Sequence, residues 1–121
     1  MKIWDDTGEA LARLLDATAL RQRVVAANLA NVNTPGYRSR DVRFEEMLQE
    51  LLRDGRPLRA ASDLPAPEIF ERKDVRPREN GNTVDLEREM GEMTRNALLY
   101  QAYTRFLDHK IATLRVAITG R

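Results

Sequence analysis

The sequence contains no cysteine and only one histidine, His109, among its 121 residues. Without cysteine the chain can form neither a disulfide framework nor a thiolate metal site. No acidic residue stands three or four positions from His109, where a helix would bring it alongside. We therefore interpret His109 as a solvated helix residue rather than a catalytic base or a metal ligand.

Neither sign of charge is in excess. Lysine and arginine number 20, aspartate and glutamate number 19, and the formal net charge is +1 with the two signs interspersed. Proteins that read nucleic acid usually carry a basic stripe, so this balance argues against nucleic acid as a partner. Aromatic residues are scarce at 6%, whereas 32% of the residues are charged. This composition is typical of long helices with solvent-exposed faces and a small hydrophobic core.

Long hydrophobic runs are missing as well. No stretch reaches the roughly 18 apolar residues that a membrane-spanning helix needs. The first ten residues include Lys2, Asp5, Asp6 and Glu9, which leave no apolar segment for a cleavable secretory signal. We expect a chain that is either soluble or exported by a route that reads no signal peptide.

Residues with the chemistry of an active site do not converge in a recognisable pattern. Glu45 with Glu46, and Glu87 with Glu89, lie on segments of helical pattern, where such close neighbours point apart. The phosphate-binding patterns G-x-x-x-x-G-K and G-x-G-x-x-G are absent. The sequence thus predicts no enzyme, no catalytic, cofactor-binding or metal-binding residue, and no small-molecule substrate.

An N-terminal core helix is predicted within residues 1–33. A largely apolar stripe advances there by steps of mostly four and three, the heptad spacing of helices that pack along a seam. The stripe comprises Trp4, Leu11, Leu15, Thr18, Gln22, Val25, Leu29 and Val32.

This helix should stop before Thr34. Proline disfavours helical geometry at the residue before it, and Pro35 with Gly36 suits the centre of a type II turn that ends at Tyr37. The asparagines just upstream, Asn28 and Asn31 among them, can bond free carbonyls at a helix end or the backbone of another segment.

A C-terminal core helix is predicted within residues 83–121, starting near Thr83 or Asp85 and ending near Thr119. Its heptad register is the strongest pattern in the chain and predicts an assembly seam. Besides Thr104, the seam comprises Leu86, Met90, Met93, Ala97, Tyr100, Leu107, Ile111, Leu114 and Ile118. Leu99, Tyr103 and Phe106 form a second apolar edge, which could contact either a second neighbour or the middle of the same chain.

The middle segment, residues 34–82, is predicted to hold the turn, a short helix over 44–52 and a loop-rich stretch. Four prolines and two glycines between residues 53 and 82 favour irregular structure there. Residues 58–61 and 68–71 could be short extended pieces.

The predicted fold is therefore mainly α. Two long terminal helices pack as an antiparallel coiled-coil-like pair around a short helix and an irregular, loop-rich middle, with Trp4 near Leu114 and Ile118. One apolar seam is a thin margin against the entropy of ordering a long helix. We expect the helices to gain stability by packing with copies or relatives, with a free-standing helical hairpin as the alternative.

Residues 27–37 read A-N-L-A-N-V-N-T-P-G-Y. This run resembles the signature A-N-x-A-N-x-x-T-P-G-Y of the flagellar rod and hook axial proteins. The matching positions form a rod-signature motif of Asn28, Asn31, Thr34, Pro35, Gly36 and Tyr37. The runs 40–44 and 80–89 are similar to R-D-V-x-F and N-G-N-x-V-D-L-x-x-E of a proximal-rod member, so the resemblance covers the chain except about residues 53–78.

The resemblance implies a structural subunit of the proximal rod in the bacterial flagellum basal body. Such a subunit polymerises into the tubular drive shaft, links the MS ring to the distal rod and lies in the periplasmic space. It would pass unfolded through the flagellar type III export apparatus without a cleavable signal peptide. Its expected partners are copies of itself, other flagellar rod proteins and the MS-ring junction protein FliE.

The alternative is a helical adaptor or export chaperone for other flagellar proteins. Chaperones of that kind are usually acidic dimers without a T-P-G-Y turn. Residues 34–37 therefore favour the rod subunit.

Overall fold

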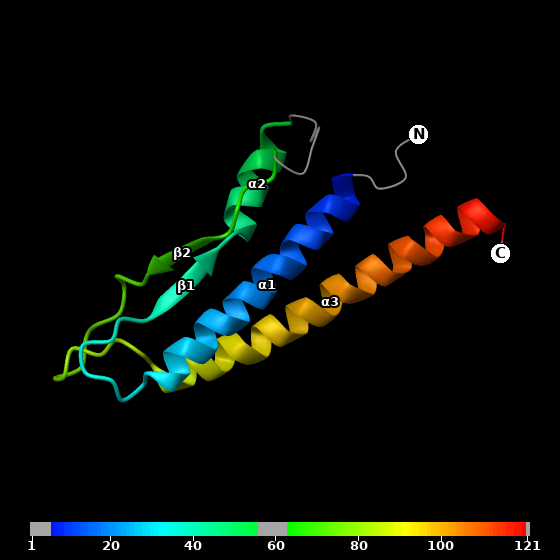
Figure 1. Cartoon of the computed structure of the whole chain (residues 1–121). Coiled ribbons are helices and arrows are strands. Elements are labelled where there is room, and N and C mark those ends of the chain that lie inside the picture. Colours follow the sequence, from blue (N-terminus) through cyan, green and yellow to red (C-terminus); the bar gives the residue numbers. More distant parts are fainter. Residues whose placement is uncertain (1–5, 56–62, 121) are drawn as a thin grey trace.

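The computed structural model describes residues 6–55 and 63–120. In chain order the elements are α1 (Asp6–Ala30), β1 (Arg40–Arg43), α2 (Glu45–Arg53), β2 (Glu68–Glu71) and α3 (Leu86–Thr119). Figure 1 shows α1 and α3 side by side and antiparallel, with the two strands and α2 along the other side of α1. The prediction of a mainly helical fold with two long, packed terminal helices is confirmed.

The ends of the long helices follow from local chemistry. The side chain of Asp85, the N-cap of α3, accepts a hydrogen bond of 3.3 Å from the backbone of Arg88. At the other end Gly120 adopts a φ of 70° and donates its N–H to the carbonyl of Val116. Both bounds agree with the sequence, which placed the helix between the Thr83–Asp85 region and Thr119.

The middle of the chain contains a small antiparallel sheet. Its register pairs Arg40 with Glu71 and Arg43 with Glu68. The extended piece expected at residues 68–71 is thus strand β2, whereas its partner β1 was not predicted as a strand. The other expected piece, residues 58–61, lies outside the described residues, as does Trp4.

The hydrophobic core lies between α1 and the middle of the chain rather than between the two long helices. Ala17 of α1 packs with Phe44, Leu48 and Leu64, all buried, and with the half-buried Leu14 and Leu51. Over the described length of α3, by contrast, the buried side chains are Glu89 and Asn96. The α1–α3 contact is therefore centred on polar groups.

Most of the heptad stripe of α3 stays exposed beside that contact. Met90, Tyr100 and Ile118 are 57%, 46% and 70% exposed, although the equivalent stripe residues of α1 from Leu11 to Leu29 are buried or half-buried. A heptad pattern shows which positions share a face, but Glu89 and Asn96 determine which face meets α1. No helix among the described residues is long and apolar enough to cross a membrane.

Candidate functional site

The rod-signature turn forms as expected from Pro35 and Gly36. Tyr37 donates its N–H to the carbonyl of Thr34 at 3.2 Å, and Gly36 has a φ of 74°. Positive φ at the third position is what a type II turn requires. Asn31 supports the turn, because its Nδ2 donates to the Ala27 carbonyl at 2.8 Å and its Oδ1 accepts from Thr34 Oγ1 at 3.1 Å.

Residues 80–83 fasten this turn to the start of α3. Gly36 donates its N–H to the carbonyl of Asn80 at 2.8 Å, and Thr83 donates to the carbonyl of Tyr37 at 3.0 Å. The side-chain nitrogen of Asn82 donates to the carbonyls of Asn31 and Thr34, both at 2.8 Å. Both carbonyls also accept backbone N–H groups within the turn, from Thr34 and Tyr37, so Asn82 binds the turn itself to the start of α3.

Asn28 is the most deeply embedded residue of the motif, with 0% exposure. Its Oδ1 accepts from Tyr37 Oη at 3.2 Å and from the backbone N–H of Arg40 at 3.0 Å. Its Nδ2 donates to the Arg40 carbonyl at 2.8 Å and to Glu89 Oε2 at 3.1 Å. One amide therefore joins α1, the signature turn, β1 and α3.

Glu89 continues this network into the small sheet. Its Oε1 accepts a hydrogen bond of 2.9 Å from Arg72 Nη1, and the two side chains are 0% and 3% exposed. Arg72 also reaches Asp41 Oδ2 with Nη2 at 3.2 Å. No sequence pattern assigned Glu89 a role, and Arg72 was not predicted as a site residue because its partners Asp41 and Glu89 lie far away in sequence.

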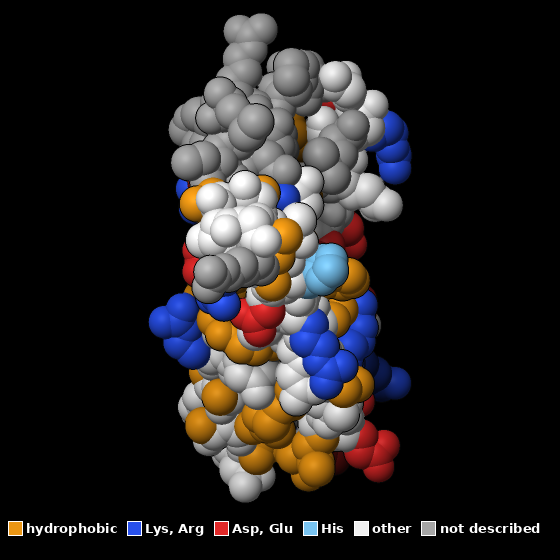
Figure 2. Space-filling model, turned by 90° about the vertical axis from the view of Figure 1, so that its right-hand side faces the viewer, with side chains coloured by type: hydrophobic (Ala, Val, Ile, Leu, Met, Phe, Trp, Pro, Cys, Tyr) orange, Lys and Arg blue, Asp and Glu red, His pale blue; other side chains and the backbone are white. Residues whose placement is uncertain are grey.

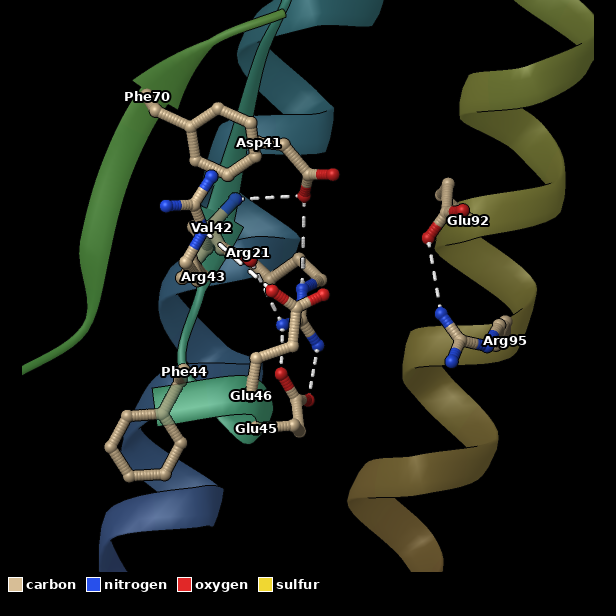
Figure 3. Close-up of a pocket in the computed structure, with 10 residues that line it drawn as sticks. All are labelled: Arg21, Asp41, Val42, Arg43, Phe44, Glu45, Glu46, Phe70, Glu92 and Arg95. Carbon is tan, nitrogen blue, oxygen red and sulfur yellow. Dashed lines mark hydrogen bonds and ion pairs between the residues drawn. The ribbon is translucent and has the colours of Figure 1, made fainter. Parts of the chain in front are cut away.

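A second arginine lies at the other end of the same network. Arg21 of α1 donates to both carboxylate oxygens of Glu45, at 2.7 and 2.6 Å, and to the Val42 carbonyl at 3.1 Å, while its Nε is 3.9 Å from Asp41 (Figure 3). The hydrogen bonds that Arg21 donates to Glu45 raise the pKa of Arg21 despite burial. Burial by itself would raise the pKa of Glu45, but its hydrogen bonds, above all with Arg21, bring that pKa below its ordinary value.

We call the connected set Arg21, Asn28, Asp41, Glu45, Arg72 and Glu89 the polar clasp. It is a pairing of groups from within the chain, and bidentate arginine–carboxylate contacts of this kind fix the relative position of elements. Among the described residues, no group of three histidine or acidic side chains is placed to hold a metal ion. The arrangement is structural.

The predicted seam lies at the surface of the single chain. Leu86 and Ile111 are 51% and 42% exposed, Ala97 is exposed, and Met93, Leu107 and Leu114 are half-buried. Figure 2, which looks onto the α3 side, shows hydrophobic side chains gathered on the lower part of this face among scattered charges.

The second edge of α3 lies partly beside other elements of the same chain. Burial, and then the charge of Glu45, raise the pKa of Tyr103, so this residue lies close to the start of α2. Phe106 is 62% exposed and Leu99 is half-buried.

Comparisons with known proteins agree with this architecture. A family model described as "Flagella basal body rod protein" matches residues 11–38, from the middle of α1 through the signature turn. The chain is 36% identical over 122 residues to the flagellar basal body rod protein FlgB of Salmonella typhimurium, covering 88% of each chain.

The likeness extends to distant bacteria. The chain is 35% identical over 112 residues to FlgB of Escherichia coli, covering 80% of this chain and 81% of the relative. It is 28% identical over 127 residues to FlgB of Bacillus subtilis, covering 99% of this chain and 98% of the relative. The chain thus belongs to the family of the flagellar basal body rod protein FlgB, and it is a structural component of the rod rather than an enzyme.

Proposed function

We propose that this chain is a proximal-rod subunit that polymerises with its own copies and with other rod proteins into the tubular drive shaft, linking the MS ring to the distal rod. The observation that carries the proposal is α3. This helix has 34 residues, yet over its described length no hydrophobic side chain is buried. Helices in proteins owe most of their stability to the tertiary packing of an apolar face.

The exposed apolar groups on α3 run along its whole length. Leu86 and Met90 near its start and Val116 and Ile118 near its end are all more than half exposed, at 51%, 57%, 53% and 70%. Large apolar side chains left exposed along one helix favour an interaction surface. Packing against neighbouring subunits would bury it, and the predicted seam residues would then form the contact.

The proposal includes the route and the first neighbour that the family resemblance implies. The chain would pass unfolded through the flagellar type III export apparatus without a cleavable signal peptide, fold in the periplasmic space and contact the MS-ring junction protein FliE.

The test is Ile111→Asp, with His109→Asp as the matched control two residues away. Ile111 is 42% exposed in the single chain, so the change should leave folding and export intact. In a packed contact the carboxylate costs several kcal/mol, so assembly should fail. His109 is also exposed, lies outside the seam and should tolerate the change.

Two readouts separate the steps. Export is measured in a strain blocked later in rod growth, and completed basal bodies are counted in an otherwise normal strain. Normal numbers of basal bodies with Ile111→Asp would refute the packed seam. If the purified chain forms a compact dimer that binds other flagellar proteins instead of rod-like polymers, it is an adaptor and the proposal is wrong.

A further inference from the structure

A groove runs between the two long helices. It has a volume of about 630 Å³ and lies between Thr18, Ala19 and Gln22 of α1 and Asn96, Ala97 and Tyr100 of α3. The alanines leave the space open, since neither helix has a large side chain at these points. Thr18 and Gln22 belong to the heptad stripe of α1, and Ala97 and Tyr100 belong to the stripe of α3. The two stripes therefore meet at the groove.

The groove contains a polar group whose bonding is incomplete. Asn96 is 2% exposed, and its Nδ2 donates to the Thr18 carbonyl at 2.8 Å and to Gln22 Oε1 at 2.9 Å. Its Oδ1 has no hydrogen-bond partner among the described residues. Buried acceptors in native proteins are nearly always paired. A rotation of the half-buried Gln22 amide would present its Nε2 hydrogens to this oxygen, while Asn96 Nδ2 keeps its bond to the Thr18 carbonyl.

A ridge that could fill such a groove lies elsewhere on α3. Leu98, Ala102 and Phe106 follow one another at intervals of four residues, which places them in one continuous row on the helix surface. Leu98 and Phe106 are 63% and 62% exposed. At about 100° per residue, the nine positions from Ala97 to Phe106 amount to about half a turn around the helix. Phe106 therefore lies on the side of α3 opposite Ala97, outside the groove, where it borders a second hollow with Thr7 and Leu11 of α1.

We propose that the ridge of one copy packs into the groove of the next copy. The proposal rests on the proposed function and names the contact between neighbouring subunits. Among the described residues that line the groove only Arg23 is charged, and the ridge carries no charge, so the contact buries no unpaired carboxylate. The chain itself supplies an apolar projection and a hollow with little charge, which favours a second copy as the occupant.

The geometry also determines the kind of contact. Two grooves brought face to face would leave both hollow, so a two-fold symmetric dimer does not satisfy them. A contact from ridge to groove is heterologous: each added copy leaves one groove and one ridge unfilled at the two ends of the row. Such a row continues to grow, as a polymer requires.

The test uses the absence of native cysteine. Ala97→Cys marks the groove and Phe106→Cys marks the ridge, and cells express each variant alone or both together. Basal bodies are isolated and oxidised, and dimers are detected after denaturing electrophoresis. A disulfide needs Cβ atoms about 4 Å apart, so the expected result is a dimer when both variants are present and none with either variant alone.

Asp108→Cys replaces Phe106→Cys as the control, because it lies on the same helix two residues away and off the ridge; it should give no dimer with Ala97→Cys. Ala19→Cys on the α1 wall of the groove provides a second pair with Phe106→Cys and should give the dimer as well. Dimers from Ala97→Cys alone would indicate a symmetric contact and overturn the proposal. Absence of dimers from both pairs in basal bodies that contain the variants would overturn it too, while the proposed function would stand. Absence of the unmodified chain from basal bodies would refute both.

Discussion

Asn28 shows how much one side chain of the rod-signature motif determines. Its amide has two donor hydrogens and two acceptor lone pairs, and all four are used, by Tyr37, Arg40 and Glu89. The sequence indicated that the asparagines here would bond a helix end or another segment of backbone. Asn31 does the first and Asn28 the second, so the two have different tasks within one motif.

We predict that Asn28→Asp lowers the free energy of unfolding by about 3 kcal/mol or more, because it removes two buried donors and places a carboxylate beside Glu89. Urea unfolding of the purified chain measures the change. Asn33→Asp introduces the same charge at an exposed position of the same segment and should shift the midpoint little. Equal midpoints for the two variants would contradict the role given to Asn28.

Glu45 should make stability depend on pH. Its pKa is lowered in the folded chain, so its stabilisation is present above the ordinary value of about 4.3 and is lost as the pH falls through the folded pKa. Glu45→Gln should therefore reduce the loss of unfolding free energy between about pH 5 and pH 3. Unfolding curves at several pH values provide the measurement.

Glu46→Gln is the matched control for this effect. Its carboxylate is 80% exposed and lies 3.8 Å from Arg43 Nε. The pH dependence of this variant should stay close to that of the unmodified chain. A pH profile of Glu45→Gln that matches the unmodified chain would show that the Arg21–Glu45 pair does not contribute.

At the scale of elements, the signature turn and the turn after α2 differ less than the sequence indicated. A type II turn requires positive φ at Gly36, whereas Gly55 stands only after a short helix. In the structure both are left-handed, with φ of 74° and 67°. The difference lies in their surroundings: a Cβ added at Gly81 would lie 3.4 Å from the Cα of Gly36, and Gly36 donates to the Asn80 carbonyl.

Gly36→Val should therefore impair basal-body assembly and motility more than Gly55→Val. Each valine is strained by about 1–2 kcal/mol in the left-handed region. At Gly36 the strain also displaces the turn from residues 80–83, so the hydrogen bonds from Asn82 to the turn are lost. Counts of basal bodies and swimming assays compare the two strains, and equal motility would argue against the importance of the docked turn.

At the scale of the whole molecule, the features with local periodicity were predictable. The 34 residues of α3 carry a regular repeat, a capping aspartate and a terminal glycine, and each is visible in the sequence. The face that α3 turns towards α1 was not predictable. A heptad pattern does not state whether its partner is the same chain or another one, and α3 keeps most of its stripe exposed.

The polar clasp was also beyond the reach of sequence patterns. Asn28 and Glu89 are 61 positions apart, and Arg21 and Glu45 are 24 apart. Nothing in the local composition distinguishes Glu89 from the exposed Glu87, because a buried ion pair depends on a partner that only the fold brings near. Asn82 lies in the run 80–89 that resembles the family pattern. Its hydrogen bonds to the carbonyls of Asn31 and Thr34, however, depend on contacts that only the fold creates.

The buried contacts between α3 and the rest of the chain lie near one end of the helix. Glu89 and Asn96 are the buried residues of α3, and both lie in its first third, while the remaining helix extends along α1 without a buried side chain. The part of α3 beyond Asn96 is about 35 Å long at 1.5 Å per residue, so a tilt of about 5° at Asn96 would move the end of the helix by roughly 3 Å. Identical subunits can therefore occupy positions of slightly different curvature by bending at the tip, without disturbing the anchor.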